Sequence, residues 1–490
     1  MSEHFDVVIV GAGLSGIGAA HHLQENCPDR SYAILEGREA IGGTWDLFRY
    51  PGIRSDSDMY TLGYSFRPWT QAKAIADGPS ILNYVRDTAR EGGIEPHIRF
   101  SHKVLSAAWS TEDAAWTVTA QKGDETVTLT CNFLFLCGGY YSYANGYTPD
   151  YPGLKAYKGR LIHPQQWPAD LDYAGKKVVV IGSGATAVTL VPEMAKTAGH
   201  VTMLQRSPTY VVSRPAEDAF ANKLRSWLPA KLAYGIIRWR NVLFGMYFYR
   251  VARNRPDVVK ANIISMVRAQ LGPDFDVAKH FTPTYNPWDQ RLCLVPDADL
   301  FEALKSGSAS VVTDHIDTFT KTGIKLKSGA ELEADIVVSA TGLNLQVLNG
   351  MTLTVDGQAV QPGETLSYKG MMYSGVPNLA SSFGYTNASW TLKCDLTCEY
   401  VCRLLNHMKA TGTRQCTPRI DDPSMETAPW LDFSSGYVQR GIAAFPKQGT
   451  KAPWKLHQNY ALDLMDLKYS SIADGAMTFS NPAPVGQKAA

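Results

Sequence analysis

Two segments of the chain share one pattern of hydrophobic and polar positions: an apolar run rich in β-branched residues, a glycine-rich turn and then a helical stretch. The first segment covers residues 7–23 and the second covers residues 178–195. A continuous apolar run predicts a strand that is buried on both faces. Each segment therefore predicts the start of a βαβ unit. Two such units predict two nucleotide sites on parallel sheets covered by helices.

Further strands are predicted between the two segments and near residue 340. Polar and apolar residues alternate over 116–119, turn residues follow at 122–124, and 126–130 resumes a strand, which together predict a hairpin within 104–135. Residues 134–139 and 335–342 each predict a core strand that ends at glycine. Glycine at these ends would let the backbone lie close to a bound dinucleotide without a clash.

Residues 219–270 predict a different region, helical and broken near Pro229 and Pro256. This stretch contains ten lysines and arginines, one acidic residue and many aromatic residues, among them Trp227, Tyr234, Trp239, Phe244, Tyr247 and Tyr249. One interpretation is a helical subdomain inserted into the second nucleotide fold, with a solvated basic face. The other is weak contact with an anionic membrane surface. We favour the first, because basic amphipathic patterns often occur without a membrane.

Length, composition and cysteine spacing exclude several classes of protein. A length of 490 residues predicts two or three domains, and 45% hydrophobic residues with a net charge of +1 give no sign of nucleic-acid binding. None of the eight cysteines forms a C-x-x-C pair, which argues against zinc and thioredoxin-type chemistry. Cys394, Cys398 and Cys402 share one helical face and are expected to be core residues. No targeting segment or membrane-spanning apolar run is evident, so we expect a cytoplasmic protein.

The first glycine turn carries the residues that a dinucleotide requires. Gly11 permits the tight turn, Gly13 lets the backbone approach a pyrophosphate, and Gly16 lets the helix pack closely on the strand. The helix N-terminus supplies N–H donors to the phosphates. Glu36 follows at the end of the next strand, where a carboxylate accepts hydrogen bonds from a ribose 2′-OH and repels a 2′-phosphate. This site is predicted to bind FAD or NAD.

The second glycine turn contains Gly182, Gly184 and Ala187, and alanine is an accepted variant at the third position. Arg206 lies after the next strand, nearly where Glu36 lies in the first unit, and Ser207 follows it. A guanidinium suits a doubly charged 2′-phosphate, and the hydroxyl adds a donor. The second site is therefore predicted to bind NADP. The alternative for Arg206 is a solvated charge at a strand end.

Two short stretches resemble the fingerprints of type I Baeyer–Villiger monooxygenases. One contains Gly43, Trp45, Tyr50-Pro51-Gly52 and Asp56, and the other contains Tyr157, Gly159, His163, Trp167 and Pro168. The family usually has phenylalanine where Tyr157 stands, and an aromatic ring is kept. Residues 286–293 and 384–390 resemble the subgroup that contains the mycobacterial ethionamide-activating monooxygenase, and this similarity covers nearly the whole chain.

The resemblance implies an α/β fold with two Rossmann-like domains, one for FAD and one for NADPH, and a helical insertion. The implied ranges are 1–145 and 343–490 for the FAD domain, 150–213 and 291–342 for the NADPH domain, and 214–290 for the insertion. Gly43, Trp45 and Asp46 are expected to contact the cofactors. Many relatives have lysine where Gln290 stands, so NADPH binding is expected to depend more on Arg206. His163, Trp167 and Pro168 are expected to form a linker motif with Gly159.

The implied reaction passes from NADPH through FAD and O2 to a C4a-peroxyflavin, which attacks a ketone to give an ester. Arg291 is expected to stabilise the peroxide anion, because a guanidinium does not lose its proton under working conditions. Asp56 is expected to pair with Arg291 and offset its burial. The alternative for both residues is an ordinary structural ion pair. The substrate pocket is expected to include the helical insertion and segments near Trp390.

Other functions stay open at this point. Flavin monooxygenases also oxidise sulfides, thioamides and amines, and the family resemblance implies that both activities can coexist. A non-catalytic dinucleotide-binding protein is the alternative outside enzymes, and Asp56, Arg291 and Trp167-Pro168 together argue against it. The predicted partners are O2 and a small ketone or sulfide. Oligomeric state is not predicted.

Overall fold

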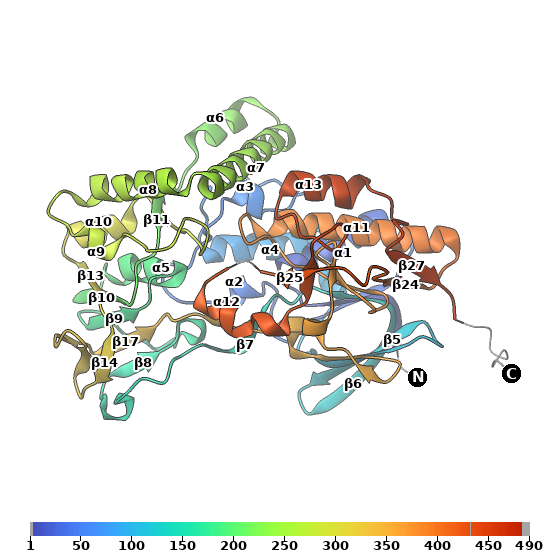
Figure 1. Ribbon diagram of the computed structural model, residues 1–490, viewed down its shortest axis with the longest axis horizontal. Helices are drawn as coiled ribbons and strands as arrows, with labels where there is room; N and C mark the ends of the chain where they lie inside the picture. The colour runs from blue at the N-terminus through green and yellow to red at the C-terminus, as the bar shows by residue number, and fades with distance from the viewer. Residues whose placement is uncertain (1–2, 432, 483–490) are drawn as a thin grey trace.

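The computed structural model describes residues 3–431 and 433–482. It contains two main sheets, each built around one of the predicted βαβ units, with the helical stretch lying across both (Figure 1). Among the described residues, every helix is too short or too polar to cross a bilayer. The expected cytoplasmic location stays a prediction.

The first sheet has nine strands and begins with the first predicted unit. Its central strand β1 (Glu3–Val10) runs parallel to β2 (Tyr32–Leu35) and to β6 (Glu125–Leu136). The predicted hairpin is present as β5 (Ala115–Lys122) and β6, which are antiparallel. The other strands are β3 (Ile98–Arg99), β4 (Lys103–Ser110), β19 (Thr352–Val355), β20 (Gln358–Ala359) and β23 (Leu379–Ser381).

Helices from both ends of the chain cover one face of this sheet. They are α1 (Leu14–Asn26), α4 (Gly78–Glu91) and α11 (Trp390–Thr411), and they share one hydrophobic core with β1, β2 and β6. Cys394, Cys398 and Cys402 lie along α11 and are buried, as expected for small core residues. The C-terminal part of the chain thus closes the fold that the N-terminal part begins.

The second sheet has five parallel strands in the order β13-β10-β9-β17-β8. Their bounds are β8 (Arg160–Ile162), β9 (Lys177–Ile181), β10 (His200–Gln205), β13 (Ala309–Thr313) and β17 (Ile336–Ser339). Helices α5 (Ala185–Met194) and α10 (Asp299–Lys305) pack on one face. A three-stranded antiparallel sheet packs on the other, made of β14 (Ile316–Phe319), β15 (Gly323–Leu326) and β16 (Glu331–Glu333).

The predicted helical stretch forms α6 (Ala219–Trp227), α7 (Ala230–Asn254) and α8 (Pro256–Leu271), followed by the short α9 (Val277–His280). The breaks fall at Pro229 and Pro256, as predicted, because proline starts a helix but cannot continue one. Helix α8 packs on the core of the second sheet through Val267. Helix α7 lies against the first fold, so this helical stretch contacts both (Figure 1).

Arg238 on α7 joins this helix to the first fold through hydrogen bonds and an ion pair. Its guanidinium donates to the carbonyl oxygens of Tyr60 (2.9 Å) and Gly63 (2.7 Å) and pairs with the Asp395 carboxylate on α11 at 3.3 Å. Arg238 is buried, and a buried cation needs such partners to offset its lost hydration.

The chain passes from the first sheet to the second through β7 (Tyr141–Gly146) and returns through β18 (Leu343–Leu345). These two strands pair antiparallel and so bring both crossings to one place. The boundaries between the predicted FAD and NADPH domains fall near these crossings. The domain ranges themselves stay a prediction. Residues 1–2, 432 and 483–490 of those ranges lie outside the described residues.

Shorter elements complete the described part of the fold. Four further two-stranded pairs are β11 (Val211–Arg214) with β12 (Cys293–Pro296), β21 (Ser367–Tyr368) with β22 (Met372–Tyr373), β24 (Gln415–Pro418) with β27 (Met477–Ser480), and β25 (Thr427–Pro429) with β26 (Lys447–Gly449). The remaining α-helices are α2 (Thr44–Leu47), α3 (Met59–Leu62), α12 (Gly436–Gly441) and α13 (Tyr460–Leu464).

Candidate functional site

A cavity of about 680 Å³ is lined by residues of both folds. This volume is in the range of small-molecule and cofactor sites. From the first fold the lining includes the glycine turn after β1, Glu36 and the segment around Trp45. From the second fold it includes Ala185, Thr186 and Thr189 of α5. The cavity therefore spans the region between the two predicted nucleotide sites.

The first glycine turn has the geometry that its sequence predicts. Gly11 has φ +103°, and a Cβ at this position would lie 2.8 Å from the Cα of Gly138. A Cβ on Gly16 would lie 1.8 Å from the carbonyl oxygen of Gly11, so the helix packs on the turn with no room for a side chain. A Cβ on Gly13 would reach Gly43 at 3.5 Å. These glycines leave a cradle at the N-terminus of α1, which fits the pyrophosphate of a dinucleotide.

Glu36 is held in place at the edge of this cradle. It is 5% exposed and lines the cavity. One carboxylate oxygen accepts from the backbone N–H of Ala12 (2.7 Å), and the other accepts from that of Arg38 (2.9 Å). Burial raises the pKa of Glu36, and the two backbone donors partly oppose that shift. Each oxygen keeps a lone pair for a ribose hydroxyl.

Asp46, predicted to contact a cofactor, lies in a cluster of arginines instead of on the cavity lining. Its carboxylate accepts from Arg38 (2.7 Å) and Arg86 (3.0 Å) and lies 3.6 Å from Arg49. Arg38 does line the cavity, so Asp46 orients a cation that faces it. Direct contact of Asp46 with a cofactor stays a prediction. Gly43 and Trp45 line the cavity themselves.

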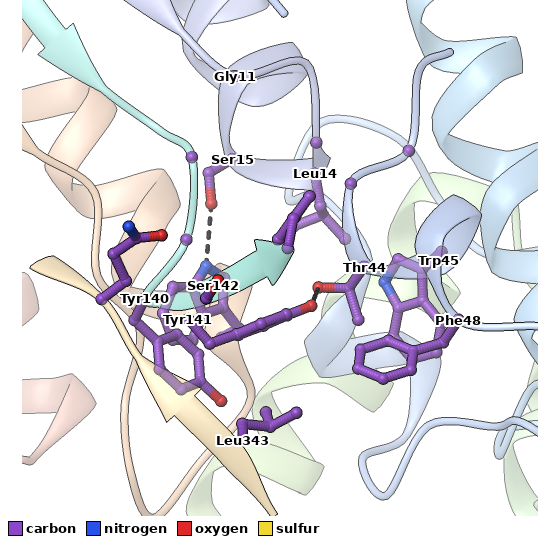
Figure 2. Close-up of a pocket in the computed structure, with 18 of the residues that line it drawn as sticks. Gly11, Leu14, Ser15, Thr44, Trp45, Phe48, Tyr140, Tyr141, Ser142 and Leu343 are labelled. Carbon is purple, nitrogen blue, oxygen red and sulfur yellow. Dashed lines mark hydrogen bonds between the residues drawn. The ribbon is translucent and has the colours of Figure 1, made fainter. Parts of the chain in front are cut away.

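An aromatic wall encloses the middle of the cavity. Sequence reasoning placed the segment near Trp390 at the pocket but missed the three tyrosines of the wall. Tyr140, Tyr141 and Tyr143 follow the glycines that end β6, and all three line the cavity. The Tyr141 hydroxyl lies 2.5 Å from that of Thr44 (Figure 2). Trp390 stacks on Tyr140 with ring centroids 5.1 Å apart, and its indole N–H donates to Ser15. The sequence feature that could have indicated this wall is the tyrosine-rich run 140–143, which directly follows a predicted glycine turn.

Arg291 and Asp56 lie on the cavity lining, as a pair. The guanidinium and the carboxylate are 3.5 Å apart, although the residues come from distant parts of the chain. About 40% of the Arg291 side chain is accessible, because it opens into the cavity. The negative charge of Asp56 raises the pKa of Arg291 above its ordinary value. The guanidinium is therefore a permanent cation facing the cavity.

The segment that carries Arg291 is supported by the helical stretch. Trp288 has φ +71°, an unusual conformation for a large side chain, and its ring packs against Tyr249 of α7 with centroids 5.6 Å apart. Arg253 of α7 donates to Asp289 at 2.8 Å. Of the described residues in the predicted insertion, 214–290, none lines the cavity. The expectation that the insertion lines this pocket is thus wrong for this cavity, because α7 packs on the outside of the first fold and acts through the Arg291 segment.

The second glycine turn is more open than the first. Gly182 has φ +142° and contacts Ala340, but no residue that the structure describes lies within 4 Å of a Cβ built on Gly184. Ala187 is buried in α5. Arg206 and Ser207 follow β10 and are exposed.

These five residues and Gln290 lie off the cavity lining. The predicted contacts of all six with NADP stay predictions.

The second fingerprint lies where the two folds are joined. His163 lines the cavity, accepts from the backbone N–H of Gln165, and its other ring nitrogen lies 3.2 Å from the carbonyl of Gly342. Burial lowers the pKa of His163, which favours the neutral ring. Trp167 packs against the core of the second sheet, and Pro168 follows it. A Cβ on Gly159 would collide with Tyr157 and Asp335. The four residues stay a predicted linker motif.

The chain is similar to known proteins over nearly its whole length. The family described as flavin-binding monooxygenase-like matches residues 70–239, and the NAD(P)-binding Rossmann-like domain matches residues 9–76. The FAD-containing monooxygenase EthA of Mycobacterium tuberculosis is 56% identical over 488 residues, which is 99% of this chain and 100% of the relative. EthA of Mycolicibacterium smegmatis is 53% identical over 98% of each chain.

Solved structures show the same fold. Steroid monooxygenase bound to NADP superposes with a TM-score of 0.76 at 22% identity, and cyclohexanone monooxygenase bound to ε-caprolactone with a TM-score of 0.77 at 21% identity. In both cases the match covers 98% of this chain and 100% of the solved chain. These similarities extend over both sheets and the region between them.

Proposed function

The chain belongs to the family of FAD-containing monooxygenases, and on this premise we propose that it is an NADPH-dependent Baeyer–Villiger monooxygenase. In this reaction one oxygen atom of O2 is inserted beside the carbonyl of a ketone to give an ester. The relatives and the fold confirm three predictions: the family resemblance, the α/β fold class and the assignment as a flavin-dependent enzyme. The choice of a ketone as substrate is the proposed part.

The observation that carries the proposal is the Arg291–Asp56 pair on the lining of the cavity that contains the flavin cradle. The flavin, when bound, supplies the electrons and the activation of O2. Attack on a ketone carbon places negative charge on oxygen, and a fixed cation at that place stabilises it. Arg291 provides this cation, and Asp56 holds its orientation and offsets the cost of its partial burial.

The groups around Arg291 support this role. Tyr140 and Tyr437 both lie near the guanidinium, and burial raises the pKa of each phenol. They therefore stay neutral at physiological pH and can act only as hydrogen-bonding groups. Asp56 is therefore the anion that balances Arg291 on the cavity lining, whereas the neighbouring Arg54 is paired with Asp299.

The two nucleotide sites provide the cofactors for this reaction. Gly11, Gly13 and Glu36 would hold FAD, since the turn cradles a pyrophosphate and the carboxylate accepts from a ribose. Arg206 and Ser207 would hold the 2′-phosphate of NADPH. The aromatic wall around Tyr140 would exclude water from the reacting atoms, because its rings pack against one another and against Trp390.

Replacing Arg291 tests the proposal. Arg291→Ala is expected to keep its flavin and to be reduced by NADPH, yet to lose ester formation by at least about 100-fold, as expected when one charge-stabilising donor is removed. Arg291→Lys should recover part of the rate, because the charge is kept and the forked geometry is lost. Ester formation by Arg291→Ala near the wild-type rate would exclude the proposed role.

The second candidate function is oxidation at sulfur or nitrogen. The Arg291→Ala variant distinguishes it from ketone oxidation. These substrates attack an electrophilic oxygen, so no negative charge develops on a ketone oxygen and Arg291 matters less. Ketone and sulfide should therefore be compared side by side with wild type and Arg291→Ala. A wild-type enzyme that oxidises sulfides but gives no ester from a panel of linear, cyclic and aryl ketones would favour the second candidate.

A further inference from the structure

A stripe of apolar side chains on α7 faces away from the protein. Leu232, Ile236, Trp239, Leu243 and Tyr247 are spaced at i, i+4, i+7, i+11 and i+15, which places them on one side of the helix, and all five are exposed. The opposite side of α7 carries the buried residues, including Ile237 and Arg238. Helix α7 therefore has two apolar faces, and the residues that the structure describes cover only one of them.

The stripe continues onto a second element. The ring of Trp239 contacts that of Tyr460 at the start of α13, with centroids 5.7 Å apart. Beyond Tyr460 the exposed apolar residues Leu462, Met465 and Tyr469 follow at i, i+3 and i+7. Trp227, at the end of α6, is 73% exposed. Figure 1 shows α6, α7 and α13 at the same edge of the molecule. We call this surface the α7 face.

Cations predominate along α6 and α7. Residues 219–256 contain eight lysines and arginines and no acidic residue. Lys231 and Arg250 lie at the two ends of the α7 stripe, both are exposed, and neither has an ion-pair partner among the described residues. Lys223 lies over the ring of Trp227 at 5.1 Å. Arg238, Arg240 and Arg253 pair with Asp395, Asp218 and Asp289. Lys231 and Arg250 therefore supply the positive charge beside the apolar stripe.

We propose that the α7 face docks on the surface of an anionic lipid bilayer. An exposed amphipathic helix with aromatic residues and flanking cations is suited to the boundary between headgroups and acyl chains. Trp227, Trp239 and Tyr247 would place rings at headgroup level, where such rings are favoured. Each cation near an anionic surface adds to the attraction. Helix α7 would lie in the plane of the surface, because its other face is fixed to the first fold by Arg238.

A second copy of the chain fits the same face less well. A two-fold contact places the same patch of both subunits together, so the cations at both ends of the stripe would meet like charges. An anionic bilayer meets both the apolar stripe and its cations with complementary chemistry. This proposal goes beyond the oxidation reaction and does not depend on its substrate.

Vesicle binding by the full-length, flavin-loaded protein tests the proposal. We expect binding to vesicles that contain phosphatidylglycerol, little binding to phosphatidylcholine alone, and release at high salt, since surface attraction is screened by ions. Tryptophan fluorescence should also be quenched by brominated lipids only in the anionic vesicles. Equal binding to both kinds of vesicle, or binding to neither, would overturn the proposal.

Two double variants locate the contact. Leu243→Glu with Tyr247→Glu removes the apolar contact, and Lys231→Glu with Arg250→Glu reverses the charge. Each is expected to weaken vesicle binding by at least about tenfold. The matched controls are Ile420→Glu and Lys325→Glu, which change an exposed apolar residue and an exposed lysine elsewhere. Flavin absorbance and NADPH oxidation should equal wild type in all four, which establishes that they fold.

The variants also separate lipid from a second copy. If light scattering shows an oligomer that Leu243→Glu with Tyr247→Glu converts to a monomer, and vesicles are not bound by the wild type, self-association covers the face and the lipid proposal is wrong. Loss of vesicle binding in the control variants as well as in the α7 variants would likewise contradict it, since the contact would not lie on the α7 face.

Discussion

The two nucleotide folds begin with the same strand, turn and helix, yet they complete their sites differently. In the first, Glu36 is buried and both of its carboxylate oxygens accept from backbone N–H groups. In the second, Arg206 and Ser207 are exposed, and no hydrogen bond to the side chain of either is found among the described residues. The first site is preorganised and the second is open. A shared motif thus fixes where a nucleotide binds, and the surroundings decide how firmly it is held.

The difference has a structural cause. Elements from the C-terminal part of the chain, α11 and β23, return to cover the first fold. The turn around Gly184 has no comparable cover among the described residues, since none of them comes within 4 Å of a Cβ at that position. This contrast fits a flavin that stays bound through many turnovers and a nicotinamide cofactor that enters and leaves.

The largest effect is expected where the packing of the two folds differs most. Gly16→Ala would place a methyl group 1.8 Å from the Gly11 carbonyl oxygen, so the helix must move away from the turn. We expect loss of flavin and a fall of about 1–3 kcal/mol in the free energy of unfolding. The matched change is Ala187→Gly at the equivalent position of α5, which should cost about 1 kcal/mol and keep the flavin. Chemical denaturation and flavin absorbance measure both. Wild-type stability and full flavin content in Gly16→Ala would contradict the close packing at this turn.

Removing Glu36 should have the next largest effect. Glu36→Ala leaves the N–H of Ala12 without its acceptor and removes the group that faces the ribose, each worth about 1–3 kcal/mol. The Kd for FAD is expected to rise by about 10-fold to 100-fold, measured by titrating the flavin-free protein. Glu39→Ala changes an exposed carboxylate nearby and should bind FAD as wild type does. Unchanged FAD affinity in Glu36→Ala would remove this residue from the site.

Arg206→Ala should act on the second site alone. We expect the KM for NADPH to rise about tenfold, since an exposed phosphate contact contributes on the order of 1 kcal/mol, while the KM for NADH hardly changes. Lys176→Ala removes another exposed cation near this sheet and serves as the control. Steady-state kinetics with both nucleotides provide the measurement. Equal losses with NADPH and NADH would argue against recognition of the 2′-phosphate by Arg206.

The smallest effect concerns pH. Because burial raises the pKa of Glu36, the folded flavin-free protein binds this proton more tightly than the unfolded chain does. Its stability contribution therefore falls as pH rises from the ordinary glutamate pKa of 4.5 through the raised value in the fold. Glu36→Gln should flatten this part of the profile of Tm against pH, and Arg206→Ala should not. Parallel profiles for Glu36→Gln and wild type would contradict the assignment.

Part of the site could be read from local sequence. The glycine turns, Glu36 and the helix breaks at Pro229 and Pro256 follow from rules that act within a few residues or one βαβ unit. The stacking of Tyr140 on Trp390 could not be found in this way, because it joins a loop after β6 to the first turn of α11. The arginines around Asp46 were missed for the same reason, since Arg86 reaches it from α4.

By itself, the sequence determined two nucleotide folds and a family resemblance that relatives over nearly the whole chain confirm. It also predicted a cofactor preference for each fold. Only the tertiary structure decided that Asp56 and Arg291 lie on one cavity, that α7 supports the Arg291 segment without lining that cavity, and that one apolar face of α7 stays uncovered. The physical reason is the distance along the chain over which each kind of interaction acts. Backbone conformation and local periodicity are set by neighbouring residues, whereas a charge pair, a cavity and an exposed face depend on how distant segments pack.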